Sequence, residues 1–201
     1  MRVVLASGNA GKLAELRMLL EPRGLDLVNQ SDFGLLSAEE TAATFVENAL
    51  LKARHASRHC ALPALADDSG LCVDALGGAP GIHSARFAGP DASDADNNLK
   101  LQETLGAYRR SATAFYYCVL VLVRHPEDPA PLLATGIWRG QIIRTARGGN
   151  GFGYDPYFEP AGSEQTAAEL DPATKNRISH RGRAIDTLLQ QLKSLQSTLQ
   201  P

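Results

Sequence analysis

The longest apolar stretch of the chain, residues 114–123, is the feature that most restricts its fold. Aromatic and β-branched residues dominate this stretch, and these residue types fit a strand better than a helix. A turn with two prolines, at residues 125–129, separates it from a second strand-like segment at residues 132–143. The spacing predicts a long antiparallel pair of strands.

The N-terminal region predicts alternation of strand and helix. Residues 2–6 have the apolar character of a short buried strand, and they run into a glycine-rich turn. Leucines then recur at helical spacing over residues 13–20, until Pro22 ends the pattern. Residues 25–28 predict a second strand after this strand-loop-helix unit.

The middle of the chain continues this alternation. The segment Thr44-Phe45-Val46-Glu47 matches a capping box, which predicts a helix extending to about His59. Residues 64–66 predict a strand, which polar residues at 67–70 are expected to break before apolar residues resume at 71–73.

Later segments complete an α/β pattern. Glycines and a proline at residues 77–81 predict a turn, and residues 93–105 have the composition of a surface helix. The last predicted helix is amphipathic, with its apolar face formed by Ile185, Leu188, Leu189, Leu192, Leu195 and Leu199. We therefore expect one α/β domain with a mixed sheet, covering residues 1–201.

Composition and charge exclude several classes of protein. The 20 Lys and Arg residues against 22 Asp and Glu give a net charge of −2, so no bulk positive field favours nucleic acid or an anionic membrane. Three cysteines without CxxC spacing favour neither a disulfide framework nor structural zinc. No apolar run reaches membrane-spanning length, and residues 1–5 are too short for a signal peptide. These features predict a cytoplasmic protein.

The loop Ser7-Gly8-Asn9-Ala10-Gly11-Lys12 is the first candidate for ligand binding. Small residues let backbone amides approach an anion, and Lys12 adds a cation at the helix start, a combination that suits phosphate. The spacing differs from a Walker A loop, because two residues separate the glycines and Leu13 follows the lysine. An ordinary strand-to-helix turn is the alternative.

The second candidate is Asp67-Asp68-Ser69-Gly70. Adjacent carboxylates repel each other unless a cation or hydrogen bonds compensate them. Mg²⁺ is the expected cation, and the aspartate pair together with Glu39-Glu40 offers the carboxylate oxygens that it prefers. A solvated acidic turn is the alternative interpretation.

Two further segments carry candidate base-binding residues. Residues 148–156 place Phe152 and Tyr154 among glycines, where an exposed aromatic can stack on a base and Asp155 can accept a base N–H. A glycine-rich hairpin with a packed phenylalanine explains the same pattern. Residues 175–181 carry basic groups at the predicted start of the last helix, where cations are unfavourable without an electron-rich ligand. A solvated basic face is the alternative there.

The order of these motifs resembles the inosine triphosphate pyrophosphatase family, also called non-canonical purine NTP pyrophosphatases. The resemblance rests on SGNAGK, ADDSGL, GGAPGIHSAR, GFGYDP and KNRISHR, which occur in this order along essentially the whole chain. It implies an elongated mixed sheet flanked by helices, with two lobes around a nucleotide-binding cleft, commonly in a homodimer. It also implies Mg²⁺-assisted hydrolysis of ITP, dITP or XTP to the monophosphate and pyrophosphate, by attack of water on the α-phosphorus.

The resemblance also implies roles for individual residues. Asp68 is expected to accept a proton and, with Glu40, to hold Mg²⁺. The expected substrate-binding residues near the phosphates are Ser7, Gly8, Asn9, Ala10, Gly11, Lys12, Lys52 and Ser69. Those near the base are Phe152, Gly153, Tyr154, Asp155, Lys175, His180 and Arg181. Lysine and arginine donors favour the O6 acceptor of hypoxanthine or xanthine over the amino group of adenine.

Two other functions are compatible with the same residues. A house-cleaning pyrophosphatase for another modified nucleotide, including a pyrimidine, is expected to carry a similar loop and metal site. A non-catalytic nucleotide-binding module is expected to bind the nucleotide without turnover.

Overall fold

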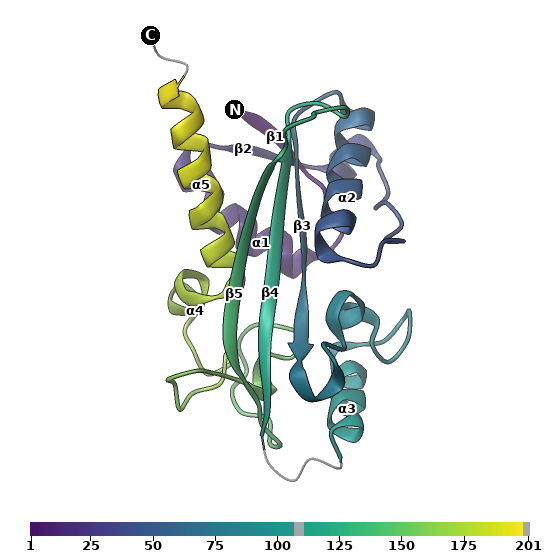
Figure 1. Ribbon diagram of the computed structural model, residues 1–201, viewed down its shortest axis with the longest axis vertical. Helices are drawn as coiled ribbons and strands as arrows, with labels where there is room; N and C mark the ends of the chain where they lie inside the picture. The colour runs from purple at the N-terminus through teal and green to yellow at the C-terminus, as the bar shows by residue number, and fades with distance from the viewer. Residues whose placement is uncertain (107–110, 199–201) are drawn as a thin grey trace. The chain divides into compact units, whose positions relative to one another are not determined.

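The computed structural model describes residues 1–106 and 111–198 and, within them, a mixed β-sheet flanked by helices (Figure 1). The strands are β1 Arg2–Leu5, β2 Asp26–Asn29, β3 Ala64–Val73, β4 Ala112–Val123, β5 Leu132–Ile142 and β6 Phe158–Pro160. The α-helices are α1 Ala10–Leu20, α2 Phe45–Cys60, α3 Asp94–Thr104, α4 Pro172–Ile178 and α5 His180–Thr198. Short 3-10 helices are η1 Glu21–Arg23, η2 Gln30–Phe33, η3 Asp74–Leu76, η4 Gly81–Arg86 and η5 Asp155–Tyr157.

The strand order of the sheet is β2-β1-β3-β4-β5-β6. β1 is parallel to both β2 and β3, whereas β5 and β6 are antiparallel. These pairings confirm the predicted α/β class with a mixed sheet. β4 and β5 are hydrogen-bonded neighbours, which confirms that the two long segments pair.

The chain forms two compact units, each built from separate segments. Unit 1 contains Met1–Asp68, Cys118–Gly136 and the chain from Arg181 onward, and unit 2 contains Ser69–Tyr117 and Ile137–His180. Each unit has its own hydrophobic core. The core of unit 1 includes Leu5, Leu16, Leu65, Leu120 and Ile185, and that of unit 2 includes Leu71, Leu101, Tyr116, Trp138 and Phe158.

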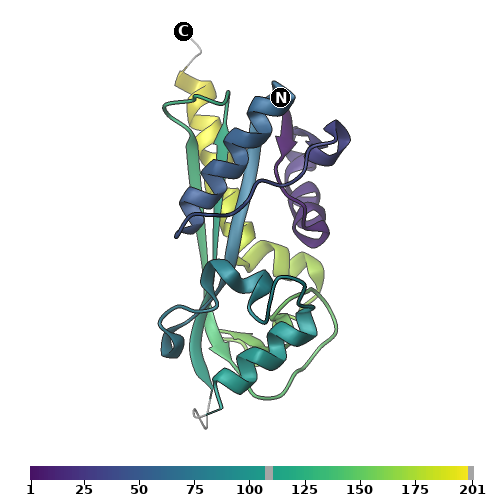
Figure 2. The same cartoon turned by 90° about the vertical axis from the view of Figure 1, so that its right-hand side faces the viewer.

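In unit 1, helices cover both faces of the strands. Successive strand side chains point to opposite faces, so Val3 and Leu5 enter the core that contains Leu16 of α1 and Ile185 of α5. Val4, which points the other way, is also fully buried. Figure 2 shows α2 on one side of these strands and α1 on the other. In the part of β3 that belongs to unit 1, Leu65 and Asp67 therefore face α1, whereas Asp68 faces α2.

The predicted break in the third strand is wrong. β3 continues from Ala64 to Val73 through both aspartates, Ser69 and Gly70. Polar residues interrupt a strand when water is their best partner, whereas Asp67 and Asp68 are buried against cationic side chains. Because ion pairs compensate these carboxylates, the backbone ladder does not have to end.

The predicted helix starts are largely confirmed. Asn9 caps α1 by accepting a hydrogen bond from the Lys12 amide, and Ser93 caps α3 with a full capping box. At α2 the Thr44 hydroxyl accepts from the Glu47 amide and donates to the Glu47 carboxylate. Each cap supplies a partner for a backbone amide that the first helical turn leaves unpaired.

The C-terminal region contains one helix that periodicity did not predict. α4 begins after Asp171, whose side chain accepts from the Thr174 amide, and Pro172 occupies the first turn. This Asp-Pro pair was the available signal. α5 then begins at His180, as predicted, and buries Ile185 and Leu188. The Leu195 side chain and Leu199, which belong to the predicted apolar face, lie outside the described residues.

A buried aspartate organises the turn between β4 and β5, and it makes the turn sensitive to acid. The Asp128 carboxylate accepts hydrogen bonds from the Arg124 amide at 2.9 Å, the Ala130 amide at 3.0 Å and the Arg124 guanidinium Nε at 2.8 Å. The Arg124 guanidinium, partly opposed by desolvation of the carboxyl, holds the pKa of Asp128 far below its usual range.

We expect Asp128→Ala to lower the free energy of unfolding by about 2 kcal/mol at neutral pH, because two amides lose their acceptor. The folded-state pKa is the lower one, so this stability is present above the unfolded pKa of about 4 and is lost as pH falls below it. The measurement is urea unfolding at pH 7 and pH 3. The difference in free energy of unfolding between wild type and variant should be smaller at pH 3 than at pH 7. A gap that is constant with pH would contradict the assignment.

Candidate active site

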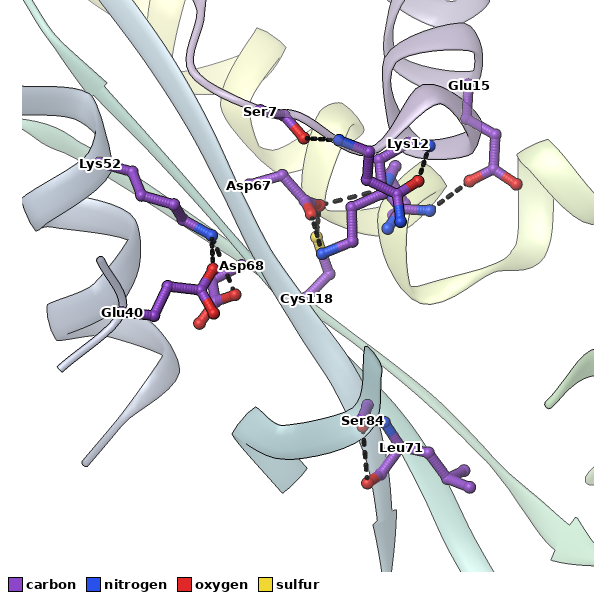
Figure 3. A network of polar contacts seen from close by, with 12 residues as sticks. Ser7, Lys12, Glu15, Glu40, Lys52, Asp67, Asp68, Leu71, Ser84 and Cys118 are labelled. Carbon is purple, nitrogen blue, oxygen red and sulfur yellow. Dashed lines mark hydrogen bonds and ion pairs between the residues drawn. The ribbon is translucent and has the colours of Figure 1, made fainter. Parts of the chain in front are cut away.

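Asp67 and Asp68 are adjacent in β3, yet their side chains point to opposite faces of the strand. Figure 3 shows Asp68 with Lys52 and Glu40 on one side of β3, and Asp67 with Lys12 and Cys118 on the other. This is the ordinary alternation of a strand. The expected repelling pair is therefore two separate carboxylates, each with its own cations.

On the α2 side, one lysine joins two carboxylates. The Lys52 Nζ atom lies 2.7 Å from Glu40 Oε1 and 3.1 Å from Asp68 Oδ1. Lys52 and Asp68 are buried, and Glu40, in the segment before α2, keeps 23% of its side chain exposed. The structure thus brings together the three residues that the sequence assigned to metal and phosphate chemistry on this side.

The Asp68 carboxyl is poised to take up a proton. Burial raises the pKa of Asp68 above its ordinary value, and this effect exceeds the opposing effect of Lys52. For Lys52 itself burial lowers the pKa, but the carboxylates of Asp68 and Glu40 outweigh burial and hold it above the usual value. Lys52 therefore stays charged beside an acid whose proton affinity is increased, an arrangement typical of functional sites.

The donor set on this face fits a hard cation. The Asp68 Oδ2 atom is buried and has no hydrogen-bond partner among the described residues, although its Oδ1 atom accepts from Lys52. A buried oxygen without a partner is costly, and Mg²⁺ prefers carboxylate oxygens, retaining waters for its other positions. Within residues 1–106 and 111–198 no group of three or more His, Cys, Asp or Glu side chains could hold a metal ion. A metal at Asp68 and Glu40 would therefore have one or two carboxylate ligands from the described residues.

On the opposite face, Asp67 is fully buried among cations. Its Oδ1 atom lies 2.8 Å from Lys12 Nζ, and its Oδ2 atom accepts from Arg181 Nε at 3.1 Å and from the Cys118 thiol at 3.1 Å. Burial opposes the charge, but Arg181 and Lys12 hold the pKa of Asp67 well below its usual range. The pKa of Asp67 is thus shifted down, whereas that of Asp68 is shifted up.

The predicted phosphate loop runs between β1 and α1. The Ser7 hydroxyl accepts from the Asn9 amide at 3.2 Å, and Asn9 caps the helix through the Lys12 amide at 3.0 Å. Gly8 fits closely, because an added Cβ would lie 2.9 Å from the Ser37 hydroxyl oxygen. Gly8, Asn9 and Ala10 are exposed, while the Lys12 side chain is directed to Asp67. The loop therefore offers solvent-exposed residues, with the Lys12 ammonium as a nearby cation.

A second cluster of predicted residues lies in unit 2. Lys175 of α4 pairs with Asp155 at 2.6 Å between Nζ and Oδ2, and its ammonium lies 4.9 Å from the Phe152 ring centroid. Asp155 also accepts from the Phe152 amide at 2.9 Å. Phe152 is half-buried, whereas Lys175 and Asp155 are buried. The structure thus brings together a stacking ring, a donor and an acceptor.

The backbone around Phe152 is fixed by contacts that periodicity could not predict. Gly151 has a φ of +77°, and a Cβ added there would clash with the Asp155 carboxylate. The Gly153 amide donates to Asp94 at 2.6 Å, and its carbonyl accepts from Asn98 at 2.8 Å. Two residues of α3 therefore clamp the loop, and the sequence offered no signal for them.

Tyr154 and His180 lie in the packed interior of unit 2. Tyr154 is 3% exposed, and its hydroxyl donates to the Ser84 carbonyl at 2.8 Å. His180 is buried and stacks on Tyr116, with ring centroids 4.6 Å apart and 9° between the planes. Tyr116, which the sequence did not single out, also donates to Asp155 at 3.4 Å.

Two further predicted residues, Ser69 and Arg181, lie in β3 and α5 respectively. Ser69 follows Asp68 within β3 and is half-buried. Arg181, expected beside the base, is 2% exposed and pairs with Asp67 and Glu15 in unit 1. Trp138 is a buried residue of β5, a strand whose side chains alternate between buried and exposed. Among the described residues no helix is long and apolar enough to span a membrane.

Comparisons with known proteins agree on one family. The model of the Ham1 family matches residues 3–191. Proteins named dITP/XTP pyrophosphatase from Neisseria meningitidis serogroup A and from Shigella flexneri are each 56% identical to this chain. These alignments cover 95% and 96% of this chain, and 96% and 98% of the two relatives.

Solved structures give the same result. A HAM1 protein from Coxiella burnetii matches with a TM-score of 0.89 and 48% identity, over 96% of this chain and 99% of that chain. The Ham1 protein of Staphylococcus aureus matches with a TM-score of 0.85 and 36% identity, over 97% of this chain and 100% of that chain.

Proposed function

Because the chain belongs to the Ham1 family, we propose that it hydrolyses ITP, dITP and XTP to the monophosphate and pyrophosphate, with Asp68 as the proton acceptor. It is a nucleoside-triphosphate pyrophosphatase, and the family is the one that the five motifs predicted. The observation that carries the proposed role of Asp68 is its buried carboxyl, with raised pKa and one oxygen atom outside the protein's hydrogen bonds.

In the proposed reaction, Asp68 takes a proton from the water that attacks the α-phosphorus. The new bond joins the water oxygen to phosphorus, and the bond from phosphorus to the oxygen that bridges to the β-phosphate breaks. Pyrophosphate leaves with that oxygen. A general base contributes most when its pKa approaches the working pH, and burial moves the pKa of Asp68 in that direction.

Lys52 has two tasks in this proposal. Its ammonium orients Asp68 through Oδ1 and holds Glu40 beside it, at 3.1 Å and 2.7 Å respectively. Because Lys52 remains protonated, it also offers positive charge to the transferred phosphoryl group. The Ser7–Lys12 loop is proposed to hold the remaining phosphates through exposed amides at the start of α1.

Asp68 and Glu40 are proposed to hold Mg²⁺. This choice is supported by their oxygen ligands and by the buried Oδ2 atom of Asp68. When bound, Mg²⁺ supplies positive charge for the phosphate oxygens of the substrate. The protein's own contribution is to orient the two carboxylates around the Lys52 ammonium.

Phe152, Asp155 and Lys175 are proposed to bind the base. Phe152 offers a face for stacking, worth about 1–3 kcal/mol without regard to which base is present. Lys175 supplies a donor for O6 of hypoxanthine or xanthine, and the amino group of adenine would meet a cation there. Gly153, Tyr154 and His180 are proposed to shape this part of the site.

The deciding experiment is a substrate panel with Mg²⁺. Purified protein is incubated with ITP, dITP, XTP, the standard triphosphates and modified pyrimidine triphosphates, and pyrophosphate and orthophosphate are measured separately. We expect pyrophosphate from the three deaminated purine nucleotides. Orthophosphate as the first product would reject attack on the α-phosphorus. A preference for a modified pyrimidine would favour the other house-cleaning enzyme, and tight binding of ITP without turnover would favour a binding module.

We further propose that residues 1–201 act as one functional domain, as a cytoplasmic homodimer. Non-contiguous segments build each unit, which supports a single functional domain. Light scattering coupled to gel filtration tests the dimer.

A further inference from the structure

The segment GGAPGIHSAR, residues 77–86, is one of the five sequence motifs but has no part in the proposed reaction. Its 3-10 helix η4 is tied to β3 through Ser84. The Ser84 hydroxyl accepts a hydrogen bond from the Leu71 amide at 2.9 Å and donates to the Gly81 carbonyl at 2.6 Å. Figure 3 shows Ser84 on η4 beside Leu71. This segment is therefore fixed to the part of β3 that belongs to unit 2.

η4 and the residues after it support both α3 and Tyr154. Asn97 of α3 is 2% exposed, and its side chain donates to the Ala85 carbonyl at 3.1 Å and accepts from the Ala88 amide at 2.8 Å. The Ser84 carbonyl accepts from the Tyr154 hydroxyl at 2.8 Å. The segment thus holds α3 on one side and the loop that carries Phe152 and Tyr154 on the other.

α3 contacts the same loop on both sides of one glycine. The Asp94 carboxylate accepts from the Gly153 amide at 2.6 Å, and Asn98 Nδ2 donates to the Gly153 carbonyl at 2.8 Å. The same Asn98 amide group also donates to the Asp94 carbonyl at 2.8 Å, which joins the two contacts. Gly153 has a φ of +64°, and glycine has more conformations to lose than any other residue. These contacts therefore restrict a position that would otherwise be flexible.

The restriction reaches the Phe152 ring, because Gly153 follows Phe152 directly. The peptide group before Phe152 is held as well, since the Phe152 amide donates to Asp155 Oδ2 at 2.9 Å. With both of its peptide groups held, Phe152 keeps little freedom beyond rotation of its half-buried side chain. A ring that is already in place loses less conformational freedom when a ligand stacks on it.

We propose that Asp94 and Asn98 are positioning residues for base binding, which hold the backbone around Phe152 so that its ring is in place before the nucleotide binds. The inference rests on the proposed function, because Phe152 is a base-binding residue only in that proposal. It also gives residues 77–86 a role, as the support that fixes α3 and Tyr154 to β3.

Four variants test the two contacts. Asp94→Ala removes the acceptor of the Gly153 amide, whereas Asp94→Asn keeps an oxygen atom there. Asn98→Ala removes the donor to the Gly153 carbonyl. Asp96→Ala is the matched control, because Asp96 lies in the same exposed turn as Asp94. It weakens the capping box with Ser93 and keeps both contacts to Gly153.

For each protein, calorimetry measures binding of IMP and of inorganic tripolyphosphate with Mg²⁺, and kinetics give KM and kcat for ITP. We expect Asp94→Ala and Asn98→Ala each to weaken IMP binding and to raise KM about fivefold, which is part of the contribution of a stacked base. Tripolyphosphate binding and kcat should stay within about twofold of wild type. Asp94→Asn should resemble wild type, and Asp96→Ala should lower Tm without changing IMP binding.

A double-mutant cycle with Phe152→Ala separates positioning from a general structural effect. Phe152→Ala should weaken IMP binding about tenfold or more. Adding Asp94→Ala to it should weaken binding no further, because the contact acts through the ring that is now absent. An equal effect of Asp94→Ala with and without the ring would overturn the proposal. Unchanged IMP binding in both Asp94→Ala and Asn98→Ala would also overturn it.

The remaining outcomes are decisive too. If Asn98→Ala does not fold, as judged by circular dichroism, the two Asp94 variants and the cycle decide alone. If wild-type protein binds IMP but releases no pyrophosphate from ITP, the proposed hydrolysis fails, and the IMP comparison still accepts or rejects the role of α3. Absence of IMP binding by wild-type protein would overturn both proposals.

Discussion

Asp68→Asn is expected to lower kcat for ITP by about a thousandfold, because asparagine keeps the shape of the side chain but cannot accept the proton. Pyrophosphate release with saturating ITP and Mg²⁺ is the measurement. Near-normal turnover would assign the proton acceptor to another group. The change should be in kcat more than in KM, because the lost interaction belongs to the transition state.

The same variant is expected to be at least as stable as wild type at neutral pH. Burial makes the folded-state pKa of Asp68 higher than its unfolded value, so the protonated, neutral form suits the folded protein better. The contribution of this group to stability is therefore fully present below the unfolded pKa and is lost as pH rises through the folded one. Asparagine stays neutral throughout, so its Tm advantage should be largest near pH 7 and shrink toward pH 4.

Asp67→Asn is the matched control on the same strand, and its expected effect on stability is opposite in sign. Asp67 is a buried anion that Lys12 and Arg181 keep ionised, and removing its charge leaves two cations without that partner. Breaking a buried pair in this way costs about 3–5 kcal/mol. Thermal unfolding of the two variants side by side tests the division of roles, and equal destabilisation of both would contradict it.

This difference between neighbours was partly readable in the sequence. Residues 64–66 and 71–73 were predicted as strand, and a continuous strand through residues 67–70 would have placed the two carboxylates on opposite faces. A break at residues 67–70 was predicted because polar side chains without known partners are expected to be in contact with water. Which cations compensate them depends on Lys12, Lys52 and Arg181, which come from distant parts of the chain.

Local signals predicted the elements well, and long-range contacts account for what they missed. The caps at Asn9, Thr44 and Ser93 involve residues a few positions apart, so the sequence contains both partners. The clamp of α3 on Gly153 joins positions more than 50 residues apart, and nothing in either segment specifies the other. Arg181 contacts Asp67 and Glu15, which lie more than 100 residues before it, so its motif alone could not predict these partners.

Lys175→Met is expected to have the largest effect in unit 2, because it changes both stability and base preference. The Asp155 carboxylate is 3% exposed and accepts from Lys175 Nζ at 2.6 Å. Truncating the cation leaves a buried carboxylate without its counter-charge, at a cost of about 3–5 kcal/mol. Loss of the proposed donor to O6 should also reduce the preference for ITP over ATP about tenfold or more. Lys100→Met, an exposed lysine on α3, is the control.

The double variant Lys175→Met with Asp155→Asn separates the two effects. Asparagine removes the buried charge while it keeps an acceptor for the Phe152 amide, so most of the lost stability should return. The preference for ITP over ATP should not return, because the proposed donor to O6 is still absent. Urea unfolding gives the first quantity, and the ITP:ATP ratio of kcat/KM gives the second. If the double variant recovered both, Lys175 would act by maintaining the fold around Phe152. If only stability recovered, the loop that carries Phe152 would be intact in a protein that no longer prefers ITP over ATP. The lysine itself would then be the group that distinguishes the deaminated base.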